Sequence, residues 1–183
     1  MIRTELFVNP IWEGTIRLNN KLLTNMFEQS KKMNYLAYNK SSIDGSEQTR
    51  DLVCMKEFAD TQRRIENFYK FETGHDVRMG NSWICKNVKG SSNELHLHGN
   101  SHISGVYYIN VPENGGGLVF RNPNDCVHMA DECVHKDPCW YNKYTKDVVT
   151  GMIIFFPSYL PHKTEVNRSD EPRLALSFNM RYI

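Results

Sequence analysis

Residues 81–111 read NSWICKNVKGSSNELHLHGNSHISGVYYINV. Short runs rich in Val, Ile and Tyr alternate there with Gly, Asn and Ser. The same texture continues through GLVF at 117–120, MIIFF at 152–156 and RLALSFNMRY at 173–182. Short strands separated by turn residues are typical of all-β sandwiches and barrels. The second half of the chain is therefore predicted to form a mainly β core, with a hairpin at ENGGG (113–117).

The first 80 residues predict helices that support this core. Apolar residues of two stretches recur every three or four positions, as in amphipathic helices. The first runs from about Arg17 to Met33, and the second carries the apolar positions Leu52, Met55, Phe58, Ile65 and Phe68. The opening LFVNPIW (6–12) predicts an edge strand or extended arm, because Pro10 cannot donate to a central ladder. We expect one domain over residues 1–183, with 1–80 mostly helical and 81–183 forming the β core.

Composition excludes several classes of protein. The 183 residues include 22 basic and 21 acidic side chains, a net charge of +1, so charge alone does not drive binding to nucleic acid or to an anionic membrane. No apolar stretch approaches the roughly 18 residues of a transmembrane helix, and the start lacks the apolar block of a signal peptide. The five cysteines, an odd number, favour a reducing compartment, so we expect a cytoplasmic protein. The oligomeric state is left open.

The segment ELHLH at 94–98 carries the strongest chemical signal. Side chains at i and i+2 of a strand share a face, so His96 and His98 emerge together with Glu94. A third metal ligand must come from another strand, and His162, just after an apolar strand, is the best candidate. Imidazole suits Zn, Cu, Fe and Ni, so residue type alone does not choose the metal. Taken alone, an H-x-H pair is more often fortuitous than a metal site.

The final strand predicts an anion-binding site. In RLALSFN (173–179), Arg173, Ala175 and Ser177 share one face, while the other face is apolar. A small, polar face with one Arg should line a cavity for an anionic ligand. The guanidinium fork matches a carboxylate bidentately, and the Ser177 hydroxyl can add a hydrogen bond. A structural ion pair of Arg173 is the alternative.

The order of these motifs is H-x-H, SGVYYIN, GGGLVF, G-x4-FP-x4-H and R-x3-S. It resembles the iron(II)/2-oxoglutarate-dependent oxygenases, above all the small bacterial and phage 2OG-Fe(II) oxygenases and more distantly the prolyl hydroxylases. The similarity runs from about Trp83 to Asn179. It implies a double-stranded β-helix (jelly-roll, cupin-like) core and Fe(II) held by a His-x-Asp/Glu…His triad. His96 matches the first position of that triad and His162 the last.

His98 departs from the family pattern, because it stands where the carboxylate is usual. A third neutral imidazole leaves the metal one negative charge poorer, which should weaken Fe(II) binding and shift its reactivity. Glu94 or Asn100 could supply a ligand instead, and a site with two histidines is a further alternative.

By the same resemblance, Arg173 binds the distal carboxylate of 2-oxoglutarate, assisted by Tyr108 and Ser177. Similarity to the YYLN strand of the prolyl hydroxylases selects Tyr108 over Tyr107. The implied reaction consumes 2-oxoglutarate and O2 and hydroxylates an unknown prime substrate, a peptide side chain or a small metabolite. No catalytic residue beyond the metal ligands is needed. Two alternatives are a three-His cupin-type dioxygenase that uses no 2-oxo acid and a non-catalytic jelly-roll binding module.

The polar segment 122–149 is long for a loop and predicts an insertion between strands. It carries five candidate ligands for a structural zinc, in the pattern C-x-H-x4-C-x-H-x3-C: Cys126, His128, Cys133, His135 and Cys139. The spacing matches no standard zinc finger. A lid or substrate-recognition role is the interpretation that we favour.

Overall fold

The computed structural model describes residues 8–37, 42–43, 45–124 and 142–183. Helices α1 and α2 span Asn20–Lys32 and Ala59–Thr73, and a short 3-10 helix spans Lys56–Phe58. The strands are β1 (Trp12–Thr15), β2 (Leu36–Ala37), β3 (Ser42–Ile43), β4 (Glu47–Thr49), β5 (Val77–Asn87), β6 (Ser92–Asn93), β7 (Ile103–Asn110), β8 (Leu118–Arg121), β9 (Lys143–Lys146), β10 (Met152–Pro157), β11 (His162–Thr164) and β12 (Arg173–Tyr182).

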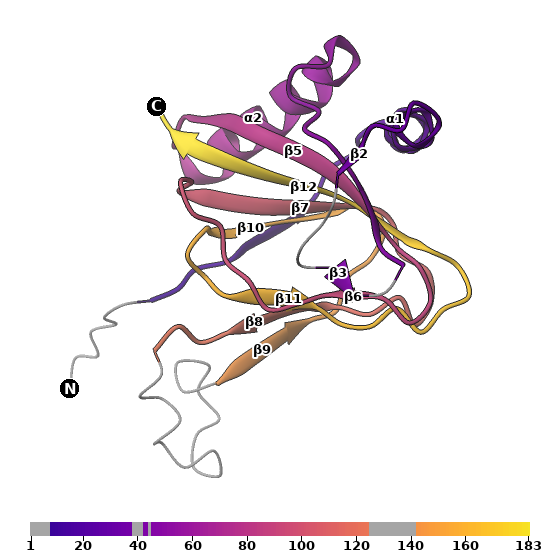
Figure 1. Cartoon of the computed structure of the whole chain (residues 1–183). Helices are drawn as coiled ribbons and strands as arrows, with labels where there is room; N and C mark the ends of the chain where they lie inside the picture. Colours follow the sequence, from indigo (N-terminus) through magenta and orange to yellow (C-terminus); the bar gives the residue numbers. More distant parts are fainter. Residues whose placement is uncertain (1–7, 38–41, 44, 125–141) are drawn as a thin grey trace, which may run out of the picture.

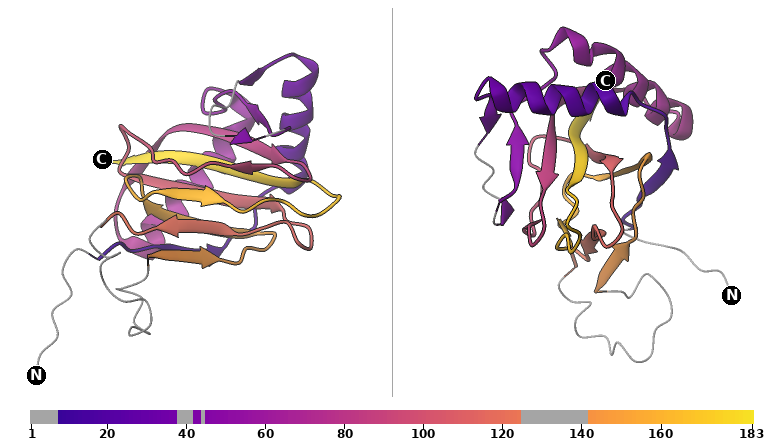
Figure 2. Two further views of the ribbon diagram at one scale, coloured as in Figure 1. Left: turned by 60° about the horizontal axis from the view of Figure 1, so that its bottom comes forward. Right: turned by 90° about the vertical axis from the view of Figure 1, so that its right-hand side faces the viewer.

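Two antiparallel sheets face each other, and both helices cover the outer face of the larger one (Figure 1). The larger sheet has the strand order β1-β10-β7-β12-β5-β4-β2, and the smaller has the order β11-β8-β9. Strands β3 and β6 pair with each other next to the smaller sheet (Figures 1 and 2). The predicted mainly β, jelly-roll core with flanking helices is confirmed.

Helix α1 begins at Asn20, about three residues later than predicted, because Asn19 caps it. The Asn19 side chain accepts a hydrogen bond from the Leu22 amide at 3.0 Å. The apolar face predicted from the spacing is the buried one, with Leu23, Met26 and Phe27 packed against the sheet.

Helix α2 begins at Ala59, so the prediction of a helix that includes Leu52 and Met55 is wrong at its start. The Leu52 amide donates to the Ser82 carbonyl oxygen at 2.8 Å, and the Met55 amide donates to the Leu52 carbonyl oxygen at 2.9 Å. Leu52 is therefore buried by a turn tied to β5. The helix ends at Thr73 and is followed by the C-cap residue Gly74, whose φ of 76° is left-handed.

The segment ENGGG is not a hairpin. Strand β7 before it lies in the larger sheet and β8 after it lies in the smaller sheet, so residues 111–117 cross from one sheet to the other. Antiparallel pairing instead joins β8 to β9, which lies inside the predicted insertion and shortens it. The edge strand expected from LFVNPIW begins at Trp12 and pairs with β10.

The two faces of the larger sheet pack against different layers. On β7, Tyr107 points toward α1 and donates to Asn20 Oδ1 at 2.6 Å, while Tyr108 packs in the layer between the sheets. On β12, Leu174, Leu176, Phe178 and Met180 belong to the helix-side core, and Ala175 belongs to the layer between the sheets. Because side chains alternate along a strand, Arg173, Ser177 and Asn179 face the same side as Ala175, toward the space between the sheets.

Candidate active site

Three imidazoles meet in the space between the sheets. The ligand atoms of His96, His98 and His162 all lie within 4.8 Å of one another, and this is the one such group of three among the residues that the structure describes. Their ring centroids are 4.4 Å (His96–His162), 5.0 Å (His96–His98) and 5.1 Å (His98–His162) apart. The structure thus brings together the three residues that the sequence selected as ligands.

Hydrogen bonds orient two of the rings. His96 Nδ1 lies 2.7 Å from the Glu94 carbonyl oxygen, and His162 Nδ1 lies 2.9 Å from the Leu160 carbonyl oxygen. A carbonyl oxygen only accepts, so Nδ1 is the protonated nitrogen in both rings. Each Nε2 is therefore left with a lone pair for a metal ion.

Burial keeps two of these imidazoles neutral. Desolvation, together with the nearby His96, lowers the pKa of His98 to about 4 and the pKa of His162 to about 3. Neutral imidazole is the form that binds a metal. The Glu94 carboxylate is not a member of the cluster, and Asn100 is exposed and accepts a hydrogen bond from Arg181 through its carbonyl oxygen.

Arg173 is a buried cation held by neutral partners. Its side chain is 1% exposed. Nη1 donates to the Gly115 and Gly116 carbonyl oxygens at 2.7 and 2.9 Å, and Nη2 contacts Asn87 Oδ1 at 3.3 Å and the Glu165 carbonyl oxygen at 3.4 Å. No carboxylate of the described residues forms an ion pair with it. The hydrogen-bond partners of Arg173 are thus all neutral, and the Glu165 carboxylate interacts with it only coulombically. A buried guanidinium of this kind favours an anionic ligand.

The glycine run at 115–117 allows the carbonyl oxygens to approach Arg173. Gly116 has a φ of 79°, and a Cβ there would lie 2.9 Å from the Val166 carbonyl oxygen. A Cβ on Gly117 would lie 2.5 Å from the Lys146 carbonyl oxygen. Larger residues would push this crossover away from the guanidinium.

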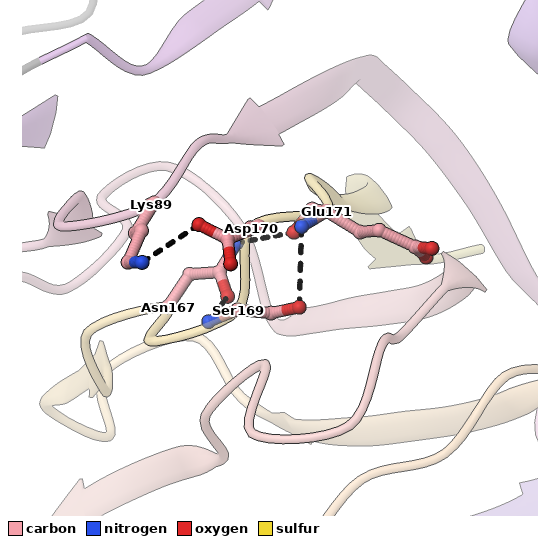
Figure 3. A network of polar contacts seen from close by, with 5 residues as sticks. All are labelled: Lys89, Asn167, Ser169, Asp170 and Glu171. Atoms are coloured by element: carbon pink, nitrogen blue, oxygen red, sulfur yellow. Dashed lines mark hydrogen bonds and ion pairs between the residues drawn. The ribbon is translucent and has the colours of Figure 1, made fainter.

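A polar loop fixes the chain just before Arg173 (Figure 3). Asn167 is fully buried and donates to the Asn87 and Glu171 carbonyl oxygens at 3.0 and 2.9 Å, while its own side-chain oxygen accepts from the Ser169 amide at 2.9 Å. An ion pair of 2.7 Å between Lys89 and Asp170 closes the loop at the surface. The end of β5 and the start of β12 are thereby tied together.

Tyr108 carries a buried polar atom with an open hydrogen-bonding capacity. Its hydroxyl has no partner among the described residues. Burial raises the pKa of Tyr108 above its ordinary value, although the nearby Arg173 opposes the shift. Tyr108 pairs with Ala175, two residues from Arg173, and Ser177 lies half-buried farther along the same face of β12. A hydroxyl of this kind suits a hydrogen-bonding ligand beside Arg173.

A buried polar chain beside His98 was not predicted from the sequence. Ser104 Oγ donates to Asn179 Oδ1 at 2.7 Å and lies 2.9 Å from Ser158 Oγ, and Asn179 Nδ2 donates to Asn81 Oδ1 at 3.0 Å. The His98 amide donates to the Ser158 carbonyl oxygen at 2.9 Å. Continuing the alternation of β12 past Ser177 would have identified Asn179. The partners of Asn179 come from distant strands and carry no local signal.

Trp83 also lies at this site, with its ring centroid 5.8 Å from that of His98.

The candidate zinc ligands Cys126, His128, Cys133, His135 and Cys139 all fall outside the described residues. In the part of the chain that is described, no helix combines the length and the apolar character needed to cross a membrane.

Comparison with known sequences agrees with this geometry. Residues 81–179, just over half of the chain, match the family described as "Putative 2OG-Fe(II) oxygenase". The chain belongs to this 2OG-Fe(II) oxygenase family. The protein is thus an oxygenase, and its family implies 2-oxoglutarate and O2 as co-substrates. No curated protein sequence matches the chain.

Solved structures of low sequence identity share the fold of this oxygenase. A prolyl-4-hydroxylase from Pseudomonas putida aligns with a TM-score of 0.63 at 15% identity, covering 94% of this chain and 92% of the other. The viral collagen prolyl hydroxylase of Paramecium Bursaria Chlorella virus-1, in complex with 2OG, gives a TM-score of 0.63 at 15% identity, covering 94% and 96%. HygX from Streptomyces hygroscopicus, with nickel, 2-oxoglutarate and hygromycin B bound, gives a TM-score of 0.63 at 12% identity, covering 94% of this chain and 83% of the other.

Proposed function

We propose that this oxygenase hydroxylates a prime substrate at an Fe(II) ion held by His96, His98 and His162, with 2-oxoglutarate bound at Arg173. One observation carries the proposal. A cluster of imidazoles and a buried guanidinium that lacks a carboxylate partner face the same space between the sheets. A metal-binding group and an anion-binding group between the same two sheets match a metal-dependent reaction of a carboxylate co-substrate.

The histidine cluster fits a metal ion. An ion about 2.1 Å from each nitrogen needs the three nitrogens roughly 3 to 4 Å apart, so a cluster that lies within 4.8 Å closes with small side-chain movements. The free Nε2 atoms of His96 and His162 supply two ligands, and His98 supplies the third. When bound, Fe(II) supports the oxidative decarboxylation of 2-oxoglutarate to succinate and CO2.

The surroundings of Arg173 fit a carboxylate. The Arg173 guanidinium is already oriented by the Gly115 and Gly116 carbonyl oxygens, so little side-chain entropy is lost when an anion binds. The Tyr108 hydroxyl is the unpaired donor beside it. Ser177, on the same face of β12, adds a further hydroxyl between Arg173 and the imidazoles.

Apolar side chains between the sheets exclude water from the site. Val106, Phe156 and Leu160 belong to this buried layer, and the Phe156 ring centroid lies 4.6 Å from that of His162. Exclusion of water strengthens the electrostatic contacts of Arg173 and limits side reactions of the bound oxidant.

Anaerobic titration tests this function. Apo protein is titrated with Fe(II), with and without 2-oxoglutarate, and visible absorption is recorded before O2 is added and succinate is measured. We expect a 2-oxoglutarate-dependent charge-transfer band, which Arg173→Ala loses and the exposed control Arg63→Ala retains. Wild-type protein without the band, or a band that survives in Arg173→Ala, would contradict the assignment.

The all-imidazole cluster favours one second candidate, a three-His dioxygenase that needs no 2-oxo acid. No carboxylate joins the cluster among the described residues. This candidate predicts substrate-dependent O2 consumption without added 2-oxoglutarate. It also predicts that Arg173→Ala consumes O2 at the wild-type rate. The same titrations therefore separate the two functions.

A further inference from the structure

We propose that the prime substrate is an acidic peptide, whose carboxylates bind Arg78 and Arg181 at the exposed end of β5 and β12. The inference rests on the proposed function, since it assigns a substrate class to that same site. Arg78 and Arg181 are exposed and lie at the end of the larger sheet opposite to Arg173.

Arg181 shares the inner face of β12 with Arg173. The two residues are eight positions apart on one strand, and the residues between them that face the helices, Leu174 to Met180 in alternation, belong to the helix-side core. Alternation places Arg173, Ala175, Ser177, Asn179 and Arg181 together on the other face. One end of this face thus carries a buried cation and the other end an exposed one.

Arg78 doubles the charge at the exposed end. It pairs directly with Arg181 across β5 and β12, and its neighbours Val77 and Met79 are buried in the helix-side core, so Arg78 points to the same side as Arg181. Like charges directly opposite each other destabilise a sheet. The nearest acidic residue in the sequence, Asp76, already pairs with Lys70 at 2.7 Å. Within the described residues, neither arginine has an ion pair that would offset this repulsion, and a bound anion would do so.

The arginine pair lies close to the turn that follows His98. Arg181 Nε donates to the Asn100 carbonyl oxygen at 2.7 Å, and Asn100 belongs to the turn that directly follows His98. Inward from the arginines, the pair Met79–Met180 faces the helices, and the register of the two strands then shifts. On the arginine face the next pairs are Asn81–Asn179 and Trp83–Ser177. Because Trp83 lies beside His98, the order from solvent inward is arginine pair, asparagine pair and metal centre.

The spacing argues for a peptide rather than a free amino acid. Ser177 is level with Trp83, and the four residues from Ser177 to Arg181 span about 13 Å along a strand. The anionic group would then lie on the order of 10 Å from the reacting atom. A carboxylate two or three residues from the modified side chain of an extended peptide covers this distance, at roughly 3.3 Å per residue.

Calorimetry tests the proposal with hexaglutamate as the probe, titrated into Ni(II)-loaded protein saturated with 2-oxoglutarate. We expect binding that weakens with salt and falls at least tenfold in the double variant R78Q/R181Q. The double variant R63Q/R64Q removes the same charge from helix α2 and should change the affinity less than twofold. R78K/R181K keeps the charge and should retain binding within about threefold. Hexaglutamine should not bind.

The outcomes are separable. Equal hexaglutamate affinity in wild type and R78Q/R181Q, or an equal loss in R63Q/R64Q, would overturn the arginine pair as the binding site. Glutarate binding as tightly as hexaglutamate would show a small carboxylate as the ligand and overturn the peptide assignment. Failure of the proposed function appears earlier, as wild-type protein that binds no Ni(II) or no 2-oxoglutarate. Retained Ni(II) and 2-oxoglutarate affinities in R78Q/R181Q would show that this variant is folded.

Discussion

His96 and His162 exchange two backbone hydrogen bonds: the His96 amide donates to the His162 carbonyl oxygen at 3.0 Å, and the His162 amide donates to the His96 carbonyl oxygen at 2.9 Å. Two segments distant in the sequence are thereby joined at the residues that carry the imidazoles. The pairing fixes the backbone at both positions, and the hydrogen bonds of Nδ1 to the Glu94 and Leu160 carbonyl oxygens orient the two rings. Side chains held in this way lose little conformational entropy when they bind a ligand.

The buried imidazoles predict that acid destabilises the apo protein. The pKa of His98 is lowered to about 4 and that of His162 to about 3, from an ordinary pKa of 6.5. At pH values below 6.5 the unfolded chain therefore binds more protons than the folded one. The free energy of unfolding should therefore fall as the pH is lowered from about 6.5 to 5, by up to about 1.4 kcal/mol per pH unit for each of the two histidines. Urea unfolding at several pH values measures this slope.

Two variants isolate that slope. His98→Gln and His162→Gln each remove one of the two groups, and each should flatten the dependence by up to one proton. A slope that is identical in His98→Gln and wild type would contradict the role of burial at this position.

The histidine cluster shows what the sequence can predict about the site. Alternation along ELHLH, taken as a strand, placed His96 and His98 on one face, and an apolar strand followed by a turn selected His162. The strand itself is not present: β6 ends at Asn93, and His96 forms only an isolated bridge with His162. The fold then delivers all three to one point. The choice of Tyr108 over Tyr107 depended on the resemblance to the prolyl hydroxylases, because periodicity alone does not say which face of a strand looks inward.

Other features required the three-dimensional structure. Leu52 and Met55 have helical spacing but lie in a turn, because the bond from the Leu52 amide to Ser82 in β5 overrides the local pattern. The partners of Asn179, namely Asn81 and Ser104, come from strands that are far apart in the sequence. Such pairings are set by sheet topology, which no local pattern encodes.

Gly105 should resist substitution, because β7 and β12 approach closely there. A Cβ at this position would lie 2.3 Å from Phe178 Cε2 and 3.0 Å from the Ile154 carbonyl oxygen. Phe178 is buried and packs against Phe155, with the two ring centroids 5.7 Å apart. We expect Gly105→Ala to lower the free energy of unfolding by about 2 to 3 kcal/mol in urea denaturation. Gly99→Ala, where a Cβ meets nothing within 4 Å, is the control and should change it by less than about 0.5 kcal/mol.

Tyr108→Phe should have opposite effects on stability and on ligand binding. Removing a buried hydroxyl that has no partner should stabilise the apo protein by about 1 kcal/mol. The same change removes a donor beside Arg173 and should weaken 2-oxoglutarate binding about tenfold, as calorimetry on Ni(II)-loaded protein would measure. Tyr107→Phe is the matched control. It loses the hydrogen bond to Asn20, so it should be destabilised while binding 2-oxoglutarate normally. Two results would contradict the assignment: weaker 2-oxoglutarate binding in Tyr107→Phe, or an unchanged 2-oxoglutarate affinity in Tyr108→Phe.

His98→Asp should change which metal the site prefers. Three neutral imidazoles suit Ni(II) and Zn(II), whereas a carboxylate adds a negative charge and a hard oxygen ligand that favours Mn(II) and Fe(II). We expect Mn(II) affinity to rise about tenfold in His98→Asp while Ni(II) affinity changes little, as competitive metal titration would measure. Leu97→Asp adds the same charge one residue away, at a side chain that is 57% exposed and points away from the cluster, so it should raise Mn(II) affinity by less than about twofold. If Mn(II) affinity rises equally in both variants, the effect is long-range electrostatics. If Mn(II) affinity does not rise in His98→Asp, the side chain at position 98 does not reach the metal, and the third ligand is another residue.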